Sequence, residues 1–212
     1  MSDARRQLFR IFVRPVLSLV ARIFYDPRFL QGRFFEQSLG GWIWVVRGMW
    51  SQKLLGMNRH VPWPVDSRNI VLSAANLEFH PDDLNNFQTF GCYFQNRDAR
   101  IRLGRGTYIA PNVGLITANH DPLDPTRHLP GQDITIGAGC WIGMNSVILP
   151  GVELGPRTTV GAGSVVTRSF PSGNCIIAGV PARVIRELAS DTHGEADASD
   201  RASISPVVQP PA

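Results

Sequence analysis

An aliphatic side chain recurs at every sixth position through much of the chain's second half. The series is Ile136, Ile142, Ile148, Leu154, Val160 and Val166. A period of six does not fit a helix of 3.6 residues per turn, and the enrichment in Val and Ile favours short strands separated by turns. The same register holds upstream at Leu103, Ile109 and Leu115. We therefore predict a coiled chain with three faces, one hexad per face, that begins before residue 103.

Two other positions of the hexad carry information, counting the aliphatic residue as the first. The fifth is small or β-branched, at Cys140, Ser146, Val152, Thr158 and Ser164, and the second is usually glycine, at Gly137, Gly143, Gly155 and Gly161. We expect the first residues to stack inward, each contributing about 1.5–3 kcal/mol on burial. We expect the glycines to supply corner backbone angles that other residues resist. Such a scaffold needs no metal and no disulfide.

Residues 117–133 interrupt the period and are rich in Pro, Asp and His, which predicts a loop that leaves the coil. Loops held by a rigid scaffold often carry the chemistry. His120, in an Asn-His-Asp-Pro sequence, is a candidate general base, because histidine titrates near neutral pH. The alternative is a loop histidine that hydrogen-bonds its own turn. Asp121 and Asp124 could orient it, although Asp-Pro pairs favour turns. We interpret His128 as a loop residue and His80 as a cap or turn residue.

Three stretches resemble the hexapeptide-repeat acyltransferases, in particular galactoside and maltose O-acetyltransferases. They are LGRGTYIAPNVGLITANHDP, ITIGAGCWIGMNSVILPGVELGPRTTVGAGSVVTRSF and IIAGVPARVIREL, from about Leu103 to Leu188. The resemblance implies an all-β, left-handed parallel β-helix that assembles as a homotrimer with active sites between subunits. It also implies transfer of an acetyl or other acyl group from acyl-CoA, a co-substrate, to a sugar hydroxyl. No tightly bound cofactor and no metal are expected.

The resemblance also supplies site residues by position. His120 matches the base that deprotonates the acceptor hydroxyl. The resemblance places coenzyme A contacts at Ala162, Thr167, Arg168, Arg183 and Arg186 and an acceptor contact at Trp141. Beyond the resemblance, we expect Gly143 to contact coenzyme A and Asn96 and Asp121 to contact the acceptor. Guanidinium groups suit phosphate oxygens, although Arg186 could equally be solvated, and the Gly143 N–H is a candidate oxyanion donor. Trp141 should point outward, either for packing between subunits or as a platform for a sugar. Gln95 is an alternative to Asn96.

Some positions depart from the family pattern. Met144 stands where related enzymes often have serine, so we expect one polar contact to the cofactor to be missing, and the loop after His120 is shorter. The family's acceptor-binding asparagine has no clear counterpart, and its N-terminal helical region, which supplies acceptor contacts, is not recognisable, so acceptor identity does not transfer. The segment HPDDLNNFQTFGCYFQN and the basic aromatic N-terminus look like acyltransferases of bacterial surface-polysaccharide biosynthesis. This looser likeness suggests an exopolysaccharide, lipopolysaccharide or lipid-linked sugar as the acceptor.

The N-terminal part is basic and aromatic: residues 1–60 hold ten Lys/Arg and three Asp/Glu, in a chain of net charge +4. Residues 8–24 are apolar except for Arg10, Arg14, Ser18 and Arg22, which would line one face of a helix. The segment is too short and too charged to span a bilayer, so we expect an amphipathic helix on an anionic membrane surface. The open alternative is that it caps the coil or packs on another subunit. No nucleic-acid motif accompanies the charge.

These patterns divide the chain into a helical extension (1–65), the β-helix (66–178) with its loop 117–133, a short C-terminal helix (179–189) and a disordered tail (190–212). Cys92, Cys140 and Cys175 form no CxxC pair, as in a cytoplasmic protein with reduced thiols. We expect a cytoplasmic location, with a peripheral position on the inner face of the cell membrane left open. The competing functional hypothesis is a non-catalytic, membrane-associated β-helix scaffold.

Overall fold

The computed structural model describes residue 7 and residues 9–189, so the expected tail 190–212 lies outside the described residues. The chain divides into two compact units, Met1–Ser67 and Arg68–Ala212. We call them the helical unit and the coil unit and describe each by itself.

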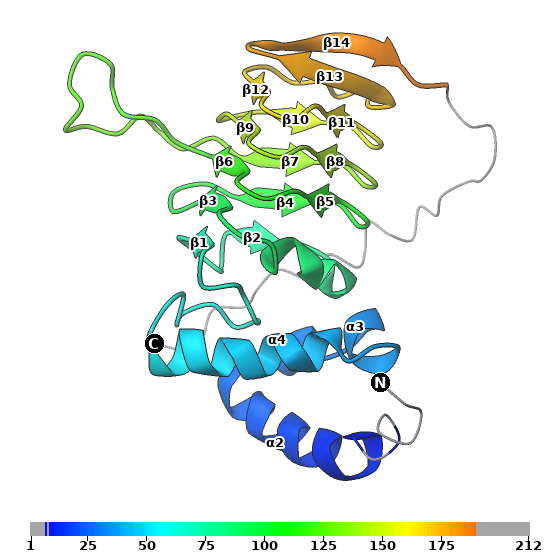
Figure 1. Ribbon diagram of the computed structural model, residues 1–212. Helices are drawn as coiled ribbons and strands as arrows, with labels where there is room; N and C mark the ends of the chain where they lie inside the picture. The colour runs from blue at the N-terminus through cyan, green and yellow to red at the C-terminus, as the bar shows by residue number, and fades with distance from the viewer. Residues whose placement is uncertain (1–6, 8, 190–212) are drawn as a thin grey trace. The chain divides into compact units, whose positions relative to one another are not determined.

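The coil unit winds through three sheets in turn (Figure 1). Sheet A contains β1 (Ile70–Val71), β3 (Tyr93–Gln95), β6 (Gly114–Ile116), β9 (Val147–Ile148) and β12 (Val165–Val166). Sheet B contains β2 (Leu77–Glu78), β4 (Ile101–Leu103), β7 (Ile134–Ile136) and β10 (Glu153–Leu154). Sheet C contains β5 (Tyr108–Ile109), β8 (Trp141–Ile142), β11 (Thr159–Val160), β13 (Cys175–Gly179) and β14 (Ala182–Glu187). All pairs are parallel except β13 with β14, so the predicted three-sided coil, beginning before residue 103, is confirmed.

The aliphatic first residues of the hexads form the core, as predicted. Ile142 pairs with Ile109 in one neighbouring coil and with Val160 in the other, and all three are buried. The other two faces repeat this arrangement, with Leu103, Ile136 and Leu154 on sheet B and Leu115, Ile148 and Val166 on sheet A. The small fifth residues are buried too, and the hydroxyl of Ser146 donates to the Gly143 carbonyl at 2.7 Å.

The predicted role of the second-position glycines is wrong. Their φ angles are not in the left-handed region; the left-handed residues stand at the fourth position of the hexad, as at Gly139, Asn145 and Gly163. The second position requires glycine for space, because a Cβ on Gly137 would lie 2.6 Å from the Pro156 nitrogen of the next coil. A Cβ on Gly143 would be equally close to the Ala162 nitrogen. Successive coils therefore touch through backbone at these corners.

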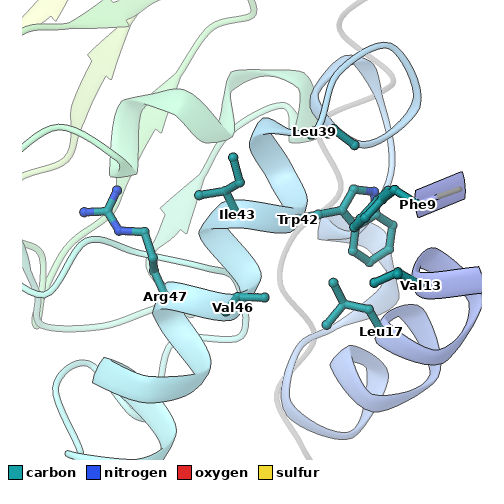
Figure 2. A pocket seen from close by; sticks show the side chains of 8 residues that line it. All are labelled: Phe9, Val13, Leu17, Leu39, Trp42, Ile43, Val46 and Arg47. Carbon is teal, nitrogen blue, oxygen red and sulfur yellow. The ribbon is translucent and has the colours of Figure 1, made fainter. Parts of the chain in front are cut away.

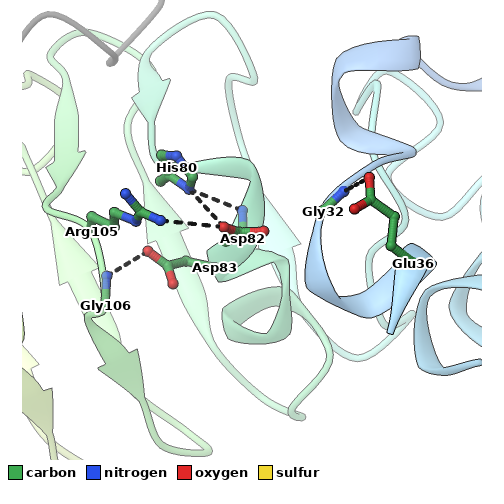
Figure 3. A network of polar contacts seen from close by, with 7 residues as sticks. All are labelled: Gly32, Glu36, His80, Asp82, Asp83, Arg105 and Gly106. Atoms are coloured by element: carbon green, nitrogen blue, oxygen red, sulfur yellow. Dashed lines mark hydrogen bonds and ion pairs between the residues drawn. The ribbon is translucent and has the colours of Figure 1, made fainter. Parts of the chain in front are cut away.

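A short helix, η4 (Pro81–Phe87), takes the place of a sheet C strand in the first coil. His80 caps it, since its Nδ1 accepts from the Asp82 N–H at 3.1 Å, which confirms the prediction of a cap residue. Figure 3 shows that Asp82 and Asp83 reach the next coil: Asp83 accepts from the Gly106 N–H at 2.7 Å, and Asp82 lies 3.6 Å from the Arg105 guanidinium.

The expected C-terminal helix over 179–189 is wrong, because β14 occupies this stretch as an antiparallel strand. The β-branched Val184 and Ile185 favour a strand. The edge of β13 also offers unpaired backbone groups that only a strand can satisfy. Pairing runs from Cys175 with Glu187 to Gly179 with Ala182, so β14 covers the last edge of sheet C.

The helical unit contains η1 (Phe9–Val13), α2 (Arg14–Phe24), η2 (Pro27–Phe29), α3 (Arg33–Glu36), α4 (Gly40–Gly48) and η3 (Met49–Leu54). Its core is aromatic, and Trp42 packs edge-on against Phe35 with ring centroids 5.2 Å apart. The buried Gln52 joins its parts by accepting from the Tyr25 hydroxyl at 3.1 Å and from the Val65 N–H at 3.0 Å. Among the described residues, no helix is long and apolar enough to cross a membrane.

Replacing Ile142 with alanine should destabilise the coil unit by about 2–5 kcal/mol, because it leaves a cavity in the middle of a stack. Urea unfolding followed by circular dichroism measures the change. Glu153→Ala, at an exposed outward position, is the control and should change stability by less than about 0.5 kcal/mol. Equal effects of the two substitutions would contradict the inward stacking.

Candidate active site

The loop 117–133 leaves the coil directly after β6 and projects from it (Figure 1). Gln95 on the neighbouring strand holds its start, since its Oε1 accepts from the N–H groups of Thr117 at 2.9 Å and Ala118 at 3.1 Å. The Gln132 N–H donates to the Thr117 carbonyl at 2.8 Å and closes the base of the loop. The two ends of the excursion are therefore tied together on the scaffold.

Asp133 fixes the end of the loop where β7 begins. Its carboxylate accepts from the Arg100 N–H and from the Arg102 guanidinium, each at 2.8 Å. These hydrogen bonds, the backbone one first, lower the pKa of Asp133 below its usual value. The carboxylate is thus ionised at neutral pH and remains a strong acceptor.

His120 lies near the root of this loop with a defined ring orientation. Its Nδ1 is 2.7 Å from the Pro125 carbonyl oxygen. Because a carbonyl oxygen can only accept, the proton of the neutral ring resides on Nδ1, and Nε2 keeps its lone pair. The His128 ring packs on it with centroids 4.1 Å apart, and the two residues also form an antiparallel bridge. The side chain is exposed, so Nε2 can be reached from outside.

Two aspartates shape the turn that presents the Pro125 carbonyl. Asp121 accepts from the Leu123 N–H at 2.9 Å. Asp124 accepts from the N–H of Thr126 at 3.1 Å and from its hydroxyl at 2.6 Å. Both carboxylates therefore act as turn formers, which is the structural reading that the Asp-Pro pairs favour. Among the described residues, neither carboxylate has a hydrogen bond to the His120 ring. They affect His120 indirectly, by shaping the turn that holds the Pro125 carbonyl.

Four of the expected coenzyme A residues lie at two different corners of the coil. Thr167 and Arg168 follow β12, at the corner of sheet A from which the loop also departs. The Arg168 guanidinium lies 5.3 Å from the Phe170 ring centroid. Gly143 and Ala162 follow strands of sheet C, and their turns are joined by a hydrogen bond from the Gly163 N–H to the Met144 carbonyl at 2.8 Å.

The expected role of the Gly143 N–H as an oxyanion donor is wrong. It donates to the Val160 carbonyl at 2.9 Å, as part of the contact between successive coils, and Gly143 is buried. An N–H group that already donates to the Val160 carbonyl is not free to donate to the oxyanion of a tetrahedral intermediate.

Trp141, Arg183 and Arg186 lie along sheet C. Trp141 is 47% exposed and stands beside Tyr108 and Thr159 on the neighbouring strands, so it points outward as predicted. Arg183 and Arg186 are exposed on β14, and the Arg183 guanidinium donates to the Ala182 carbonyl at 3.0 Å. Their exposure fits phosphate binding and solvation equally well.

The prediction that Asn96 contacts the acceptor is wrong, because the residue is fully buried. Its amide forms a closed pair with Ser73, accepting from the Ser73 N–H at 3.0 Å and donating to the Ser73 carbonyl at 2.7 Å. The open alternative, Gln95, is likewise occupied at the root of the loop. The side chains of both residues thus hold neighbouring coils and the loop in place.

Within one chain, the described structure does not gather these residues into a single pocket: they lie at two corners and along sheet C. Sequence reasoning missed the contact of His128 with His120, the carbonyl of Pro125 and the role of Gln95. The sequence gives a hint of the role of Gln95 alone, because this residue stands one coil before the point where the period breaks.

The three cysteines are free and buried, and burial raises the pKa of each thiol, that of Cys140 to about 11. They are therefore neutral and poor nucleophiles at neutral pH. Among the described residues, no group of three or more His, Cys, Asp or Glu side chains converges as a metal site would require.

Comparison with known proteins matches residues 133–168 to the family described as bacterial transferase hexapeptide (six repeats). Galactoside O-acetyltransferase of Escherichia coli (strain K12) is 43% identical over 95 residues, which cover 43% of this chain and 46% of that protein. A protein of the same strain, provisionally named lipopolysaccharide biosynthesis O-acetyl transferase WbbJ, is 36% identical over 43% of this chain and 53% of its own length. The chain spans about half the length of the curated relatives it matches.

Among solved structures, a galactoside acetyltransferase in complex with coenzyme A is 37% identical, with a TM-score of 0.44 over 49% of this chain and 53% of that one. A maltose O-acetyltransferase from Clostridium difficile 630 is 35% identical, with a TM-score of 0.43 over 47% and 54%. The chain is similar to galactoside O-acetyltransferase over less than half of its length, and residues 133–168 match the bacterial transferase hexapeptide repeat.

Proposed function

We propose that this protein is an acyltransferase that moves an acetyl or other acyl group from acyl-CoA to a sugar hydroxyl, with His120 as general base. The observation that carries the proposal is the hydrogen bond from His120 Nδ1 to the Pro125 carbonyl, which leaves Nε2 with a free lone pair on an exposed ring. The 43% identity to galactoside O-acetyltransferase over 95 residues supports the choice of reaction.

In the proposed reaction, Nε2 takes the proton of the acceptor hydroxyl while that oxygen attacks the thioester carbonyl. The tetrahedral intermediate expels the sulfur of coenzyme A, which takes the proton from the imidazolium, and the products are an ester and free coenzyme A. The hydrogen bond to Pro125 favours the ring that has gained a proton, because Nδ1 already faces an acceptor. No covalent enzyme intermediate is required, and the buried, neutral thiols fit that route.

We further propose that the coil is a left-handed β-helix and that three copies assemble, with each active site between two subunits. The separation of the candidate residues supports this arrangement. His120 projects from one corner of the coil, whereas Gly143 and Ala162 lie at another and Trp141 lies on sheet C. A neighbouring copy could complete the site by facing its own coenzyme contacts toward His120.

For the acceptor we propose a sugar of surface-polysaccharide or lipid-linked sugar biosynthesis. Two relatives carry names that assign them to galactoside acetylation and, provisionally, to lipopolysaccharide biosynthesis. The basic, apolar helical unit supports work close to an anionic membrane, where lipid-linked sugars are found. We therefore propose a peripheral position on the inner face of the membrane, with residues 8–24 contributing the contact.

Replacing His120 with alanine should lower acceptor-dependent release of coenzyme A from acetyl-CoA by about 10²–10⁴-fold, because the general base is lost. The assay follows the free thiol across a panel of nucleotide sugars and lipid-linked sugars. His60→Ala, in the helical unit, is the matched control and should keep full turnover. Full turnover by the His120 variant would refute the assigned base. Calorimetry that detects no acyl-CoA binding to the unaltered protein would favour the scaffold hypothesis instead.

Asp124→Ala should loosen the turn that holds the Pro125 carbonyl, because Thr126 loses two hydrogen bonds to that carboxylate. Amide hydrogen exchange over residues 121–127 should accelerate by up to about tenfold, since a hydrogen bond contributes about 0.5–1.5 kcal/mol. The turnover number should fall while the KM for acetyl-CoA holds. Asp98→Ala, at an exposed site, should change neither quantity. Unaltered exchange in the Asp124 variant would contradict its positioning role.

The double variant Leu19→Asp, Ile23→Asp should reduce co-sedimentation with phosphatidylcholine–phosphatidylglycerol vesicles by tenfold or more, because each apolar side chain contributes about 1.5–3 kcal/mol on leaving water. Both side chains are exposed on α2, at 70% and 74%. Ile185→Asp, at a 65% exposed position on β14, should leave vesicle binding unchanged. Loss of binding in the control alone would place the membrane contact outside residues 8–24.

A further inference from the structure

Helix α2 exposes its apolar face. Its exposed side chains include Val16, Leu19 and Ile23, which follow Phe12 at the spacing of a single helical face. The opposite face points inward: Ala21 is fully buried, and the Arg14 guanidinium lies 5.9 Å from the ring centroid of the buried Trp42. An amphipathic helix in water normally buries its apolar face. This one presents that face outward.

A second apolar stripe runs along α4 and η3. Ile43, Val46, Trp50 and Leu54 recur at intervals of three or four residues, and each is more than half exposed. The inward side of the same helices carries the buried Trp42, Val45 and Gln52 and already forms the core of the helical unit. The exposed stripe is therefore additional apolar surface beyond what the fold needs, and such surface marks an interaction site.

A cavity of about 290 Å³ lies between η1–α2 and α4. Its lining is aliphatic and aromatic, with Val13 and Leu17 on one side and Trp42, Ile43 and Val46 on the other. Figure 2 shows Val13 and Leu17 gathered beside Trp42, with Val46 extending toward Leu17. Arg47 is the charged residue of the lining. Its guanidinium points away from the apolar side chains in Figure 2 and pairs with the buried Asp66 at 3.5 Å. Ile43 and Val46 also belong to the outer stripe, so the cavity and the stripe are continuous.

The charges around the stripes favour an anionic partner. Arg22 is exposed at the end of α2, one residue before Ile23 of the stripe. In the described part of the chain, neither Arg14 nor Arg22 has a carboxylate partner. Residues 1–60 carry an excess of seven positive charges. An exposed apolar stripe with the Arg22 guanidinium beside it, on a unit with an excess of positive charge, matches a bilayer surface with anionic headgroups, where acyl chains and phosphates lie side by side.

We propose that the cavity between α2 and α4 takes up one acyl chain of an anionic phospholipid, while the two flanking stripes lie in the headgroup and acyl boundary of the membrane. The acyl chain leaves water for an apolar lining, and the headgroup remains outside, near the exposed Arg22 of α2. This inference extends the proposed membrane contact beyond residues 8–24 and does not depend on the acyltransferase reaction.

The test uses the full-length protein and lysophosphatidylglycerols of increasing chain length, kept below their micelle-forming concentrations, with calorimetric readout. Affinity should rise by roughly fourfold per methylene while the chain fills the cavity and then stop rising. Lysophosphatidylcholine of the same length should bind more weakly, because it lacks net negative charge. A plateau in affinity supports a cavity of fixed size, since partition onto an open apolar surface continues to rise with chain length.

Leu17→Trp and Leu19→Trp form a matched pair of variants on the same helix. Leu17 lines the cavity, so tryptophan there should fill it and weaken lysophosphatidylglycerol binding by tenfold or more. Leu19 is 70% exposed on the outer stripe, so its variant should bind the probe as well as the unaltered protein does. Circular dichroism checks that both variants fold, and the chain-length series needs no variant at all.

Three results would overturn the proposal. Affinity that rises with chain length without a plateau would mean partition onto the outer surface alone. Absence of saturable binding to any member of the series would mean that no chain enters. Self-association that Leu17→Trp abolishes, together with no lipid binding, would make the cavity an interface between two copies. Each result leaves the coenzyme A release assay unaffected, so failure here is distinct from failure of the proposed catalysis.

Discussion

The close approach of backbone in successive coils is the constraint on which the coil unit depends. Neighbouring parallel strands lie about 4.8 Å apart, so corners that stack at this spacing leave no room for a Cβ where the chain turns inward. Gly137 and Gly143 meet this demand, because an added methyl group would strike the backbone of the next coil. The aliphatic stack then fills the interior, and the hydrogen bonds between coils, such as Gly143 N–H to Val160 carbonyl, close around it.

The same constraint explains how far the fold could be predicted. The six-residue period follows directly from the inward stacking, so the three faces, the buried positions and the interruption at 117–133 could all be predicted from it. The reason for the glycines could not, because the period reveals where glycine stands and not whether it relieves an angle or a clash. Gly139, Asn145 and Gly163 hold the left-handed angle instead, two positions later. The C-terminal helix was a wrong prediction because nothing in the sequence of 179–189 reveals the open edge of β13.

The candidate site was only partly predictable, for a related reason. His120 is visible in the sequence because it interrupts the period, but its tautomer depends on a carbonyl five residues later in a turn built by Asp121 and Asp124. His128 approaches through the return of the loop, which no period encodes. Asn96 was misassigned because a buried asparagine that joins coils and an exposed one that binds a sugar look alike in a sequence.

The tied base of the loop has a consequence for how such a protein can diversify. β6 and β9 stay in register on either side of the excursion, as do β4 and β7, so the scaffold is indifferent to the length of what departs between Thr117 and Asp133. The entropic cost of closing a loop rises only slowly with its length. Insertions between Thr117 and Asp133 are therefore compatible with an unchanged core of the coil unit. The loop can thus change in length and composition while the stacked interior stays the same.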